Sequence, residues 1–361
     1  MATVATASPP SLEHGEARAA AQAYLKSRLT AKNSASERAF NIPWVSFQHV
    51  SAIDILFIYN GFFQITGHGV PAESRAAVLK QAERFFKLTV DKKDALHIKH
   101  SKYMRGWEPS DASYVNPADW TDAESVPETK EGFNWAYEEA LDLTGGDGQY
   151  AELDGAMVNG NVWPAEEDLP GFFEGIKNYY SKVMELARHM FRLFALSLDL
   201  PEDYFDPMMT HPGAIARLMY YPPSKDPKPL DPNEKDKEVG LGAHSDYECF
   251  TLLLCSSPTG LEVLSPDNVW TPATAVEGSF IVNVADFLMR WTNDRYKSTV
   301  HRVVNRTTET RYSVPFFFSI NYDQVVETLP SCVSPENPSK YPKIKAGEYI
   351  LQRLLATLKE D

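Results

Sequence analysis

The pattern of apolar and polar residues divides the chain into helical and β-type regions. Apolar residues recur at helical spacing in residues 72–97 and again, over a longer run, in residues 168–200, where Pro201 ends the pattern. Residues 346–360 form an amphipathic stretch near the C-terminus, and residues 11–32 are rich in Ala. We expect a helix in each of these four segments.

Short β-type runs replace the helical pattern between residues 214 and 325. Turn residues separate the runs IARLMYY, CFTLLL, LEVL, SFIVNVADF, STVHRVV and RYSVPFFFSI. Two earlier runs, IPWVSF at 42–47 and GFFQITGHGV at 61–70, are also rich in β-branched and aromatic residues and predict short strands. Several short strands at regular spacing indicate a sandwich or barrel. Because the helices precede the strands rather than alternate with them, the pattern predicts an α+β protein without an alternating parallel sheet.

Residues 100–165 follow neither pattern and hold four tryptophans among Gly, Pro and acidic residues. Long irregular segments in compact domains commonly serve as lids or binding loops. We therefore expect residues 101–140 and the helix at 346–360 to act as lids. The aromatic residues that we expect to face a ligand, or else to pack, are Tyr103, Trp107, Phe133 and Trp135.

The net charge of the 361-residue chain indicates which classes of partner it is expected to bind. Acidic residues outnumber basic ones 49 to 35, which argues against binding to nucleic acid or to an anionic membrane surface. The sequence contains neither a long apolar run nor a signal-peptide pattern, and its three cysteines form no CxxC pair. These features predict a cytoplasmic protein that acts on a small molecule. The oligomeric state stays open, because the helix at 11–32 would serve equally as a dimer arm or as packing within one subunit.

Two histidines and a carboxylate form the first candidate for chemistry. His244 and Asp246 begin the strand-like run AHSDYECFTLLL, and alternate residues of a strand point to the same face. His301 lies in the later run STVHRVV. Two His and one carboxylate on one face of a metal are typical of non-haem Fe(II) oxygenases. The alternatives are a zinc site that borrows Cys249 or Cys255 and a structural His–Asp hydrogen bond.

Arg311 is the second candidate, because an inward-facing Arg in an apolar strand requires a negative partner. Ser313 has the same strand parity as Arg311, and Tyr221 ends another run just before Pro222. A bound dicarboxylate would match the guanidinium fork, with the Ser and Tyr hydroxyls as further contacts. The alternative partner of Arg311 is a core acid such as Asp286.

These residues, with their spacings, resemble a known family. HSD at 244–246, HRV at 301–303 and RYS at 311–313 look like the motifs of the Fe(II)/2-oxoglutarate-dependent dioxygenase superfamily. Within it, the chain resembles the isopenicillin N synthase-like branch over about residues 41–358, through IPWVSF, GFFQITGHGV, NVWP, RLMYYPP and WTNDRYKSTVHRV. The AHSDYECFTLLL context is similar to fungal thymine 7-hydroxylase and natural-product tailoring oxygenases.

The resemblance implies a double-stranded β-helix (jelly roll) core with flanking helices. It divides the matched part of the chain into a helical N-terminal region (41–210), a jelly-roll catalytic core (211–330) and a C-terminal lid helix (331–361). Residues 1–40 have no counterpart in it, and we expect a tail and a helix there. It also implies that Fe(II) is the metal, that 2-oxoglutarate is the cosubstrate and that O2 is the oxidant.

The resemblance assigns roles to single residues. His244, Asp246 and His301 match the iron ligands, and Arg311, Ser313 and Tyr221 match the residues that hold the distal carboxylate of 2-oxoglutarate. Arg217, Tyr247 and Phe317 match substrate-contacting positions of related hydroxylases. Our hypothesis is that Phe317 and Tyr247 flank a flat or cyclic substrate while Arg217 binds a polar group; alternatively, Phe317 belongs to the core. Tyr247 has the wrong parity for a straight strand, so its role requires a bend.

The expected activity is oxidative decarboxylation of 2-oxoglutarate coupled to hydroxylation, desaturation or cyclisation of a small organic molecule, in secondary metabolism. One alternative is an isopenicillin N synthase-like oxidase that uses no 2-oxoglutarate and places a substrate carboxylate on Arg311. A second alternative is a non-catalytic jelly-roll binding protein, although all three metal ligands are present.

Overall fold

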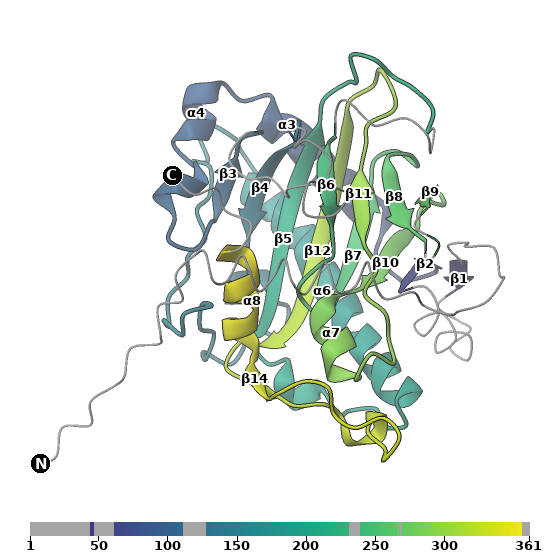
Figure 1. Cartoon of the computed structure of the whole chain (residues 1–361). Helices are drawn as coiled ribbons and strands as arrows, with labels where there is room; N and C mark the ends of the chain where they lie inside the picture. The colour runs from purple at the N-terminus through teal and green to yellow at the C-terminus, as the bar shows by residue number, and fades with distance from the viewer. Residues whose placement is uncertain are drawn as a thin grey trace, which may run out of the picture.

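The computed structural model describes residues 44–46, 61–110, 128–230, 239–265, 267 and 269–355. The helix expected at residues 11–32 lies outside this part of the chain. Figure 1 shows the strands at the centre of the molecule with helices around them, and helix α8, in yellow, on the side nearest the viewer.

The helices are α3 (Ala72–Phe86), α4 (Val90–Asp94), α6 (Phe172–Ser197), α7 (Asp286–Trp291) and α8 (Ala346–Leu355). The strands are β1 (Trp44–Ser46), β2 (Phe62–Thr66), β3 (Gly106–Glu108), β4 (Glu131–Trp135), β5 (Pro212–Tyr221), β6 (Leu241–His244), β7 (Phe250–Cys255), β8 (Leu261–Leu264), β9 (Trp270–Pro272), β10 (Phe280–Val284), β11 (His301–Val303), β12 (Arg311–Asn321), β13 (Val325–Val326) and β14 (Ile344–Lys345). In the described residues, no helix combines the length and the apolar character that crossing a membrane requires.

Two sheets carry the fold. The larger has eight strands in the order β1-β2-β10-β7-β12-β5-β4-β3, and the smaller has four in the order β6-β11-β8-β9. Only β1 and β2 pair in parallel among these strands; the other neighbours are antiparallel. The prediction of an α+β protein with antiparallel sheets and outer helices is therefore confirmed.

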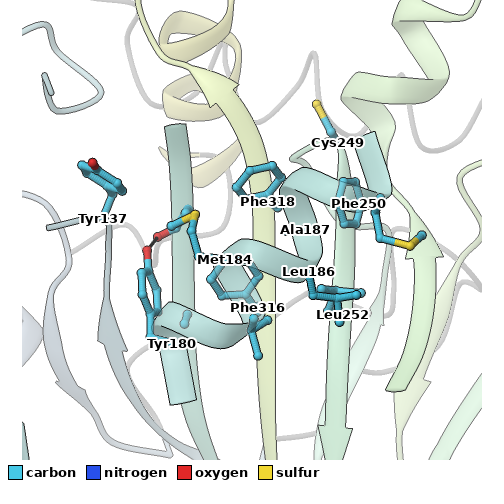
Figure 2. Close-up of a cluster of buried hydrophobic side chains, with 14 of the residues drawn as sticks. Tyr137, Tyr180, Met184, Leu186, Ala187, Cys249, Phe250, Leu252, Phe316 and Phe318 are labelled. Carbon is cyan, nitrogen blue, oxygen red and sulfur yellow. Dashed lines mark hydrogen bonds between the residues drawn. The ribbon is translucent and has the colours of Figure 1, made fainter. Parts of the chain in front are cut away.

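Strand β12 shows how the sequence divides core from cavity. Its even-numbered residues Phe316, Phe318 and Ile320 are fully buried, and Phe316 packs edge-on against Tyr180 of α6. Figure 2 shows this aromatic and aliphatic layer between α6 and the strands. Because side chains alternate along a strand, the odd-numbered residues of β12 point away from α6. The helix thus covers one face of the large sheet and leaves the other face for a site.

The segment at 100–165 is less irregular than its composition predicts. It contributes β3 and β4, which pair with each other and extend the large sheet beyond β5. Trp107 and Phe133 face each other across this pair, and both are buried. Residues far apart in the sequence form these pairs, so the local pattern alone did not reveal the strands.

Candidate active site

A cavity of about 180 Å³ lies on the inner face of the large sheet and is lined by residues of both sheets and of α8. Every predicted site residue lines it: His244, Asp246, His301, Arg311, Ser313, Tyr221, Arg217, Tyr247 and Phe317. The structure therefore brings together the residues that the sequence singled out. Ile350 and Leu354 of α8 also line the cavity.

The strand register arranges these side chains in rows across the large sheet. Arg311 of β12 lies opposite Tyr221 of β5, and Ser313 lies opposite Met219. Phe317 lies between Ile215 of β5 and Thr251 of β7. Arg311, Ser313 and Phe317 share one face of β12, as their common parity predicts.

The two histidines and Asp246 converge on one point. The Nε2 atoms of His244 and His301 lie 3.5 and 3.6 Å from Asp246 Oδ1, and the three ligand atoms all lie within 4.8 Å of one another. His244 and His301 are ladder partners on β6 and β11. One metal ion fits among these three atoms, and its remaining coordination positions would face the cavity.

The prediction that strand alternation brings Asp246 to the same face as His244 is wrong. Strand β6 ends at His244 and β7 begins only at Phe250, so Asp246 and Tyr247 lie in the connection between the two sheets. The chain bends within this connection, and this bend turns Tyr247 into the cavity although its parity does not. The pairing of His244 with Asp246 thus depends on a turn rather than on a straight strand.

Backbone carbonyls fix the orientation of both imidazoles. His244 Nδ1 lies 2.8 Å from the carbonyl oxygen of Gly242, and His301 Nδ1 lies 3.2 Å from that of Thr299. A carbonyl oxygen only accepts hydrogen bonds, so Nδ1 carries the proton in each ring. The lone pair of Nε2 is then directed toward Asp246 Oδ1, which is the arrangement of a metal-binding histidine.

Hydrogen bonds also fix the orientation of the Asp246 carboxylate. Thr251 Oγ1 and Asn283 Nδ2 donate hydrogen bonds to Oδ2 at 2.5 and 2.7 Å, which leaves Oδ1 facing the histidines. Burial opposes ionisation, but the adjacent His301 and His244 and the hydrogen bonds outweigh it and hold the pKa of Asp246 well below its usual range. Burial and the neighbouring His244 lower the pKa of His301 to about 4. An anionic carboxylate beside a neutral imidazole is the protonation state that a divalent metal requires.

Arg311 is buried without a charge partner in the described part of the chain. The residue is 2% exposed, and its Nε and Nη1 have no hydrogen-bond partner there. The alternative partner Asp286 instead accepts hydrogen bonds from Ser245, Ser298 and Arg353. A buried guanidinium with unmet donors requires an anion, and a dicarboxylate that also chelates the metal meets that need.

The surroundings of Arg311 are shaped for the guanidinium group. Its Cζ lies 5.1 Å from the centre of the Tyr221 ring, and burial raises the pKa of Tyr221 to about 12, so the phenol keeps its proton. Gly260 has φ +107°, and a Cβ there would lie 2.7 Å from Arg311 Nη1. Glycine is therefore required at residue 260 for both the backbone conformation and the space.

Cys249 and Cys255, the cysteines considered as zinc ligands, do not lie among the metal-binding residues. Cys249 is buried and its sulfur lies 3.7 Å from the hydroxyl of Ser319, while Cys255 does not line the cavity. In the described residues, His244, Asp246 and His301 make up the one group with metal-ligand geometry. This ligand set favours iron over a sulfur-ligated zinc.

Of the two alternatives left open for the loop aromatics, the structure favours packing over contact with the ligand. Trp107, Phe133 and Trp135 are buried in the core, and Tyr103 donates a hydrogen bond to Asp154 outside the cavity lining. Charged and amide side chains of the same segment line the cavity instead: Arg105, Glu108, Glu128, Lys130 and Asn134. The sequence pattern did not single out these residues. For Glu108, Lys130 and Asn134, the visible signal is a polar residue beside aromatic residues in the short runs GWE and KEGFNW.

A buried carboxylate connects the C-terminal helix to the metal-binding residues. Asp286 Oδ2 accepts hydrogen bonds from Ser245, which separates His244 from Asp246, and from Arg353 of α8 at 3.1 Å. Asp286 Oδ1 accepts a hydrogen bond from Ser298, and the Arg353 guanidinium lies 4.5 Å from the centre of the Tyr247 ring. Asp286 thus links α8 to the turn that contains Ser245 and Asp246.

Replacing Asp286 with Asn removes the charge that faces Arg353 and is expected to lower the free energy of unfolding by about 3–5 kcal/mol, as for other buried ion pairs that lose one partner. Urea unfolding of the metal-free protein at neutral pH measures the change. Asp226→Asn, at an exposed position, is the matched control. A loss below about 1 kcal/mol, the level of a surface pair, would contradict this account of Asp286.

Comparison with known proteins agrees with this geometry. Residues 212–320 match the model of the 2OG-Fe(II) oxygenase superfamily, and residues 46–166 match that of the N-terminal region of non-haem dioxygenases in morphine synthesis. A 2-oxoglutarate-Fe(II) type oxidoreductase of Emericella nidulans is 39% identical over 81% of this chain and 80% of its own length. Another from Aspergillus fumigatus is 34% identical over 83% of this chain and 84% of its own.

The solved structures give the same result. Neurospora crassa thymine 7-hydroxylase, bound to α-ketoglutarate and thymine, superposes with a TM-score of 0.72 at 28% identity, over 89% of this chain and 98% of that one. The protein is accordingly an oxidoreductase that uses Fe(II), 2-oxoglutarate and O2. The relatives, the ligand geometry and the unmet donors of Arg311 together show that the chain belongs to the 2-oxoglutarate–Fe(II) oxygenase superfamily.

Proposed function

We propose that the cavity is the active site of a 2-oxoglutarate-dependent oxygenase of secondary metabolism that oxidises a small organic molecule. The observation that carries this proposal is the buried Arg311 with unmet donors in the same cavity as the His244–Asp246–His301 group. We also assign the two facing sheets to a jelly-roll core at residues 211–330, between a helical region at 41–210 and a C-terminal lid at 331–361. The alternatives of an oxidase without 2-oxoglutarate and of a binding protein are not favoured by the relatives.

In this proposal each residue has a defined role. His244, Asp246 and His301 hold Fe(II), and Arg311 with Ser313 and Tyr221 binds the distal carboxylate of 2-oxoglutarate. When bound, the iron supplies the redox chemistry by which 2-oxoglutarate and O2 become succinate and CO2 while a substrate C–H bond is oxidised. The protein orients both organic molecules, and the apolar side chains of Phe62, Leu253, Leu261 and Val303 keep water from the site.

The test of this proposal is the formation of succinate. Purified protein with Fe(II), O2 and 2-oxoglutarate should form succinate slowly alone and faster when a substrate is added. An equal amount of oxidised product should accompany the added succinate. Substrate oxidation without succinate would instead establish the oxidase alternative.

We assign Arg217, Tyr247 and Phe317 to the substrate, in the region of the cavity beside the metal-binding residues. Phe317 is only half-buried and neighbours Thr251, which supports Asp246, so its ring faces the cavity rather than the core. Arg217 lies one row away on β5, and Tyr247 approaches from the connection between the sheets. In this proposal, a flat substrate lies between the two aromatic rings with its edge toward Arg217.

Phe317→Ala is expected to raise the KM for the substrate about 30-fold or more, because a stacked ring contributes about 2 kcal/mol or more to binding. The dissociation constant of 2-oxoglutarate should stay within about threefold of the wild-type value, since Arg311 is untouched. The neighbouring Phe318→Leu is the matched control, because Phe318 points into the core and its loss should lower stability without changing KM. A variant of Phe317 that loses 2-oxoglutarate before substrate would contradict the assignment.

A further inference from the structure

Arg353 of helix α8 contacts two residues beside the metal-binding turn from outside the cavity. Its Nη2 donates a hydrogen bond to Asp286 Oδ2 at 3.1 Å, and its Cζ lies 4.5 Å from the centre of the Tyr247 ring. The side chains of Arg353 and Asp286 are only 7% and 1% exposed. Tyr247 lines the cavity and Arg353 does not, so the guanidinium lies on the side of the ring that faces away from the cavity.

Helix α7 fixes the main chain on both sides of Tyr247. The backbone N–H of Asp286 donates a hydrogen bond to the carbonyl oxygen of Asp246 at 2.9 Å, and that of Phe287 donates one to the carbonyl oxygen of Glu248 at 3.1 Å. These two bonds hold the backbone but not the side-chain torsions of Tyr247. The orientation of the ring must therefore be set by contacts of the side chain itself.

Arg353 supplies the charged contact to this ring. Among the described residues, Arg353 is the cation that stacks on Tyr247, and the Tyr247 hydroxyl has no hydrogen-bond partner there. A desolvated guanidinium over an aromatic face favours the stacked arrangement about 30-fold, or by about 2 kcal/mol. Because Asp286 also holds the guanidinium, the direction of the Tyr247 ring is coupled to both α7 and α8.

The spacing of residues along α8 explains how one helix reaches both α7 and the cavity. Residues four apart lie on the same face of a helix. Tyr349 and Arg353 face α7, where Tyr349 stacks on Phe287 with ring centres 5.2 Å apart (Figure 1). Ile350 and Leu354, each one residue further along, line the cavity. The contacts with α7 thus keep the adjoining face of α8 at the cavity.

We propose that Arg353 is a positioning residue of the oxygenase reaction, which holds the Tyr247 ring in the orientation that meets the substrate. This inference rests on the proposed function, in which Tyr247 contacts the substrate. Because Arg353 itself lies outside the cavity lining, its loss should disturb the placement of the substrate and spare the binding of iron and 2-oxoglutarate.

Misplacement of the substrate has a defined chemical consequence. A shift of about 1 Å in the reacting C–H bond can slow its oxidation about 100-fold. With ascorbate present, 2-oxoglutarate and O2 then still give succinate and CO2, and the second oxygen atom leaves as water. Ascorbate supplies the two electrons that the substrate no longer gives, and becomes dehydroascorbate. Loss of Arg353 should therefore separate succinate formation from substrate oxidation.

The first test observes the ring directly. Meta-fluorotyrosine is incorporated at residue 247 of the full chain, which is loaded with 2-oxoglutarate and with diamagnetic Zn(II) in place of iron, and fluorine NMR is recorded. In Arg353→Met the resonance should move toward that of free fluorotyrosine. In Arg353→Lys, which keeps a cation that can stack and pair with Asp286, it should stay near the wild-type position. An unchanged resonance in Arg353→Met would overturn the proposal.

Arg290→Gln is the matched control for this test. Arg290 stacks on Tyr341 and Tyr349, with its Cζ 4.8 and 5.8 Å from the ring centres, and does not line the cavity. Its replacement removes an arginine–tyrosine contact of the same kind and should leave the resonance of residue 247 in place. An equal shift in Arg290→Gln would mean that the ring responds to general loosening, which would also overturn the proposal.

The second test measures turnover with Fe(II) and ascorbate, and with thymine, nicotinamide and benzamide as trial ring compounds. For the compound that most stimulates succinate release, Arg353→Met should raise the KM about 10-fold or more. Succinate should also exceed oxidised product by at least about twofold. The dissociation constant of 2-oxoglutarate should stay within about threefold, and Arg353→Lys should recover part of the loss. A wild-type KM and product ratio in Arg353→Met would overturn the proposal.

The remaining outcomes are separable. If none of the three compounds stimulates the wild type, the fluorine resonance decides whether Arg353 holds the ring. If Arg353→Met does not fold, the double variant with Asp286→Asn replaces it in both tests, because it removes both members of the buried pair together. If the wild type forms neither the iron–oxoacid band nor succinate, the proposed function fails, and the fluorine resonance still reports on Arg353 alone.

Discussion

Arg311→Ala is expected to raise the dissociation constant of 2-oxoglutarate about 100- to 1000-fold, which corresponds to about 3–4 kcal/mol. The guanidinium is buried, and its unmet donors would be satisfied by the distal carboxylate of the oxoacid. Without it, that carboxylate would be buried with only neutral hydroxyl partners. Calorimetric titration of 2-oxoglutarate into the iron-loaded protein measures the effect.

Two controls separate this role from a general effect of removing an arginine. Arg192→Ala removes an exposed arginine that pairs with Asp206 on the protein surface, and it should leave the dissociation constant unchanged. Arg311→Lys keeps the charge but not the fork, so it should recover only part of the affinity. Equal affinity in wild type and Arg311→Ala would show that the oxoacid binds elsewhere.

Asp246→Asn is expected to abolish coupled turnover, with a loss of at least about 1000-fold, or about 4 kcal/mol in the barrier. The substitution keeps the size of the side chain, and Thr251 and Asn283 can still hold it. It removes the only negative charge of the three metal ligands, so Fe(II) affinity should fall by more than about 100-fold. Iron content after dialysis and the rate of succinate release measure the two effects.

The exposed Asp226→Asn removes the same charge outside the cavity lining and should leave both values unchanged. If Asp246→Asn retained iron and turnover, the assignment of the metal ligands would be wrong.

The sequence predicted the site best where it depends on strand alternation. Arg311, Ser313 and Phe317 are odd-numbered residues of one long strand, and parity alone places them on one face. The same rule failed at Asp246, because a turn and not a strand carries it. Parity is reliable only inside a regular strand, and catalytic residues often lie just beyond a strand end.

Other parts of the site depend on contacts between distant residues. Glu108 reaches Arg217 only because β3 and β4 extend the large sheet past β5, a pairing that no local pattern encodes. Asp286 joins α8 to the metal-binding turn across 67 residues. For the tryptophans of the 100–165 segment, the sequence left core packing and ligand contact both open, because large aromatic residues serve a core as readily as a ligand site.

The most direct test of the central claim is an anaerobic titration of the Fe(II)-loaded protein with 2-oxoglutarate. We expect the weak visible charge-transfer band of the iron–oxoacid chelate to appear and to saturate at one oxoacid per chain. The band should require far more 2-oxoglutarate in Arg311→Ala and should be absent in Asp246→Asn. Iron that stays bound in the wild type without any band would contradict the account, and would direct the search to substrates that place their own carboxylate on Arg311.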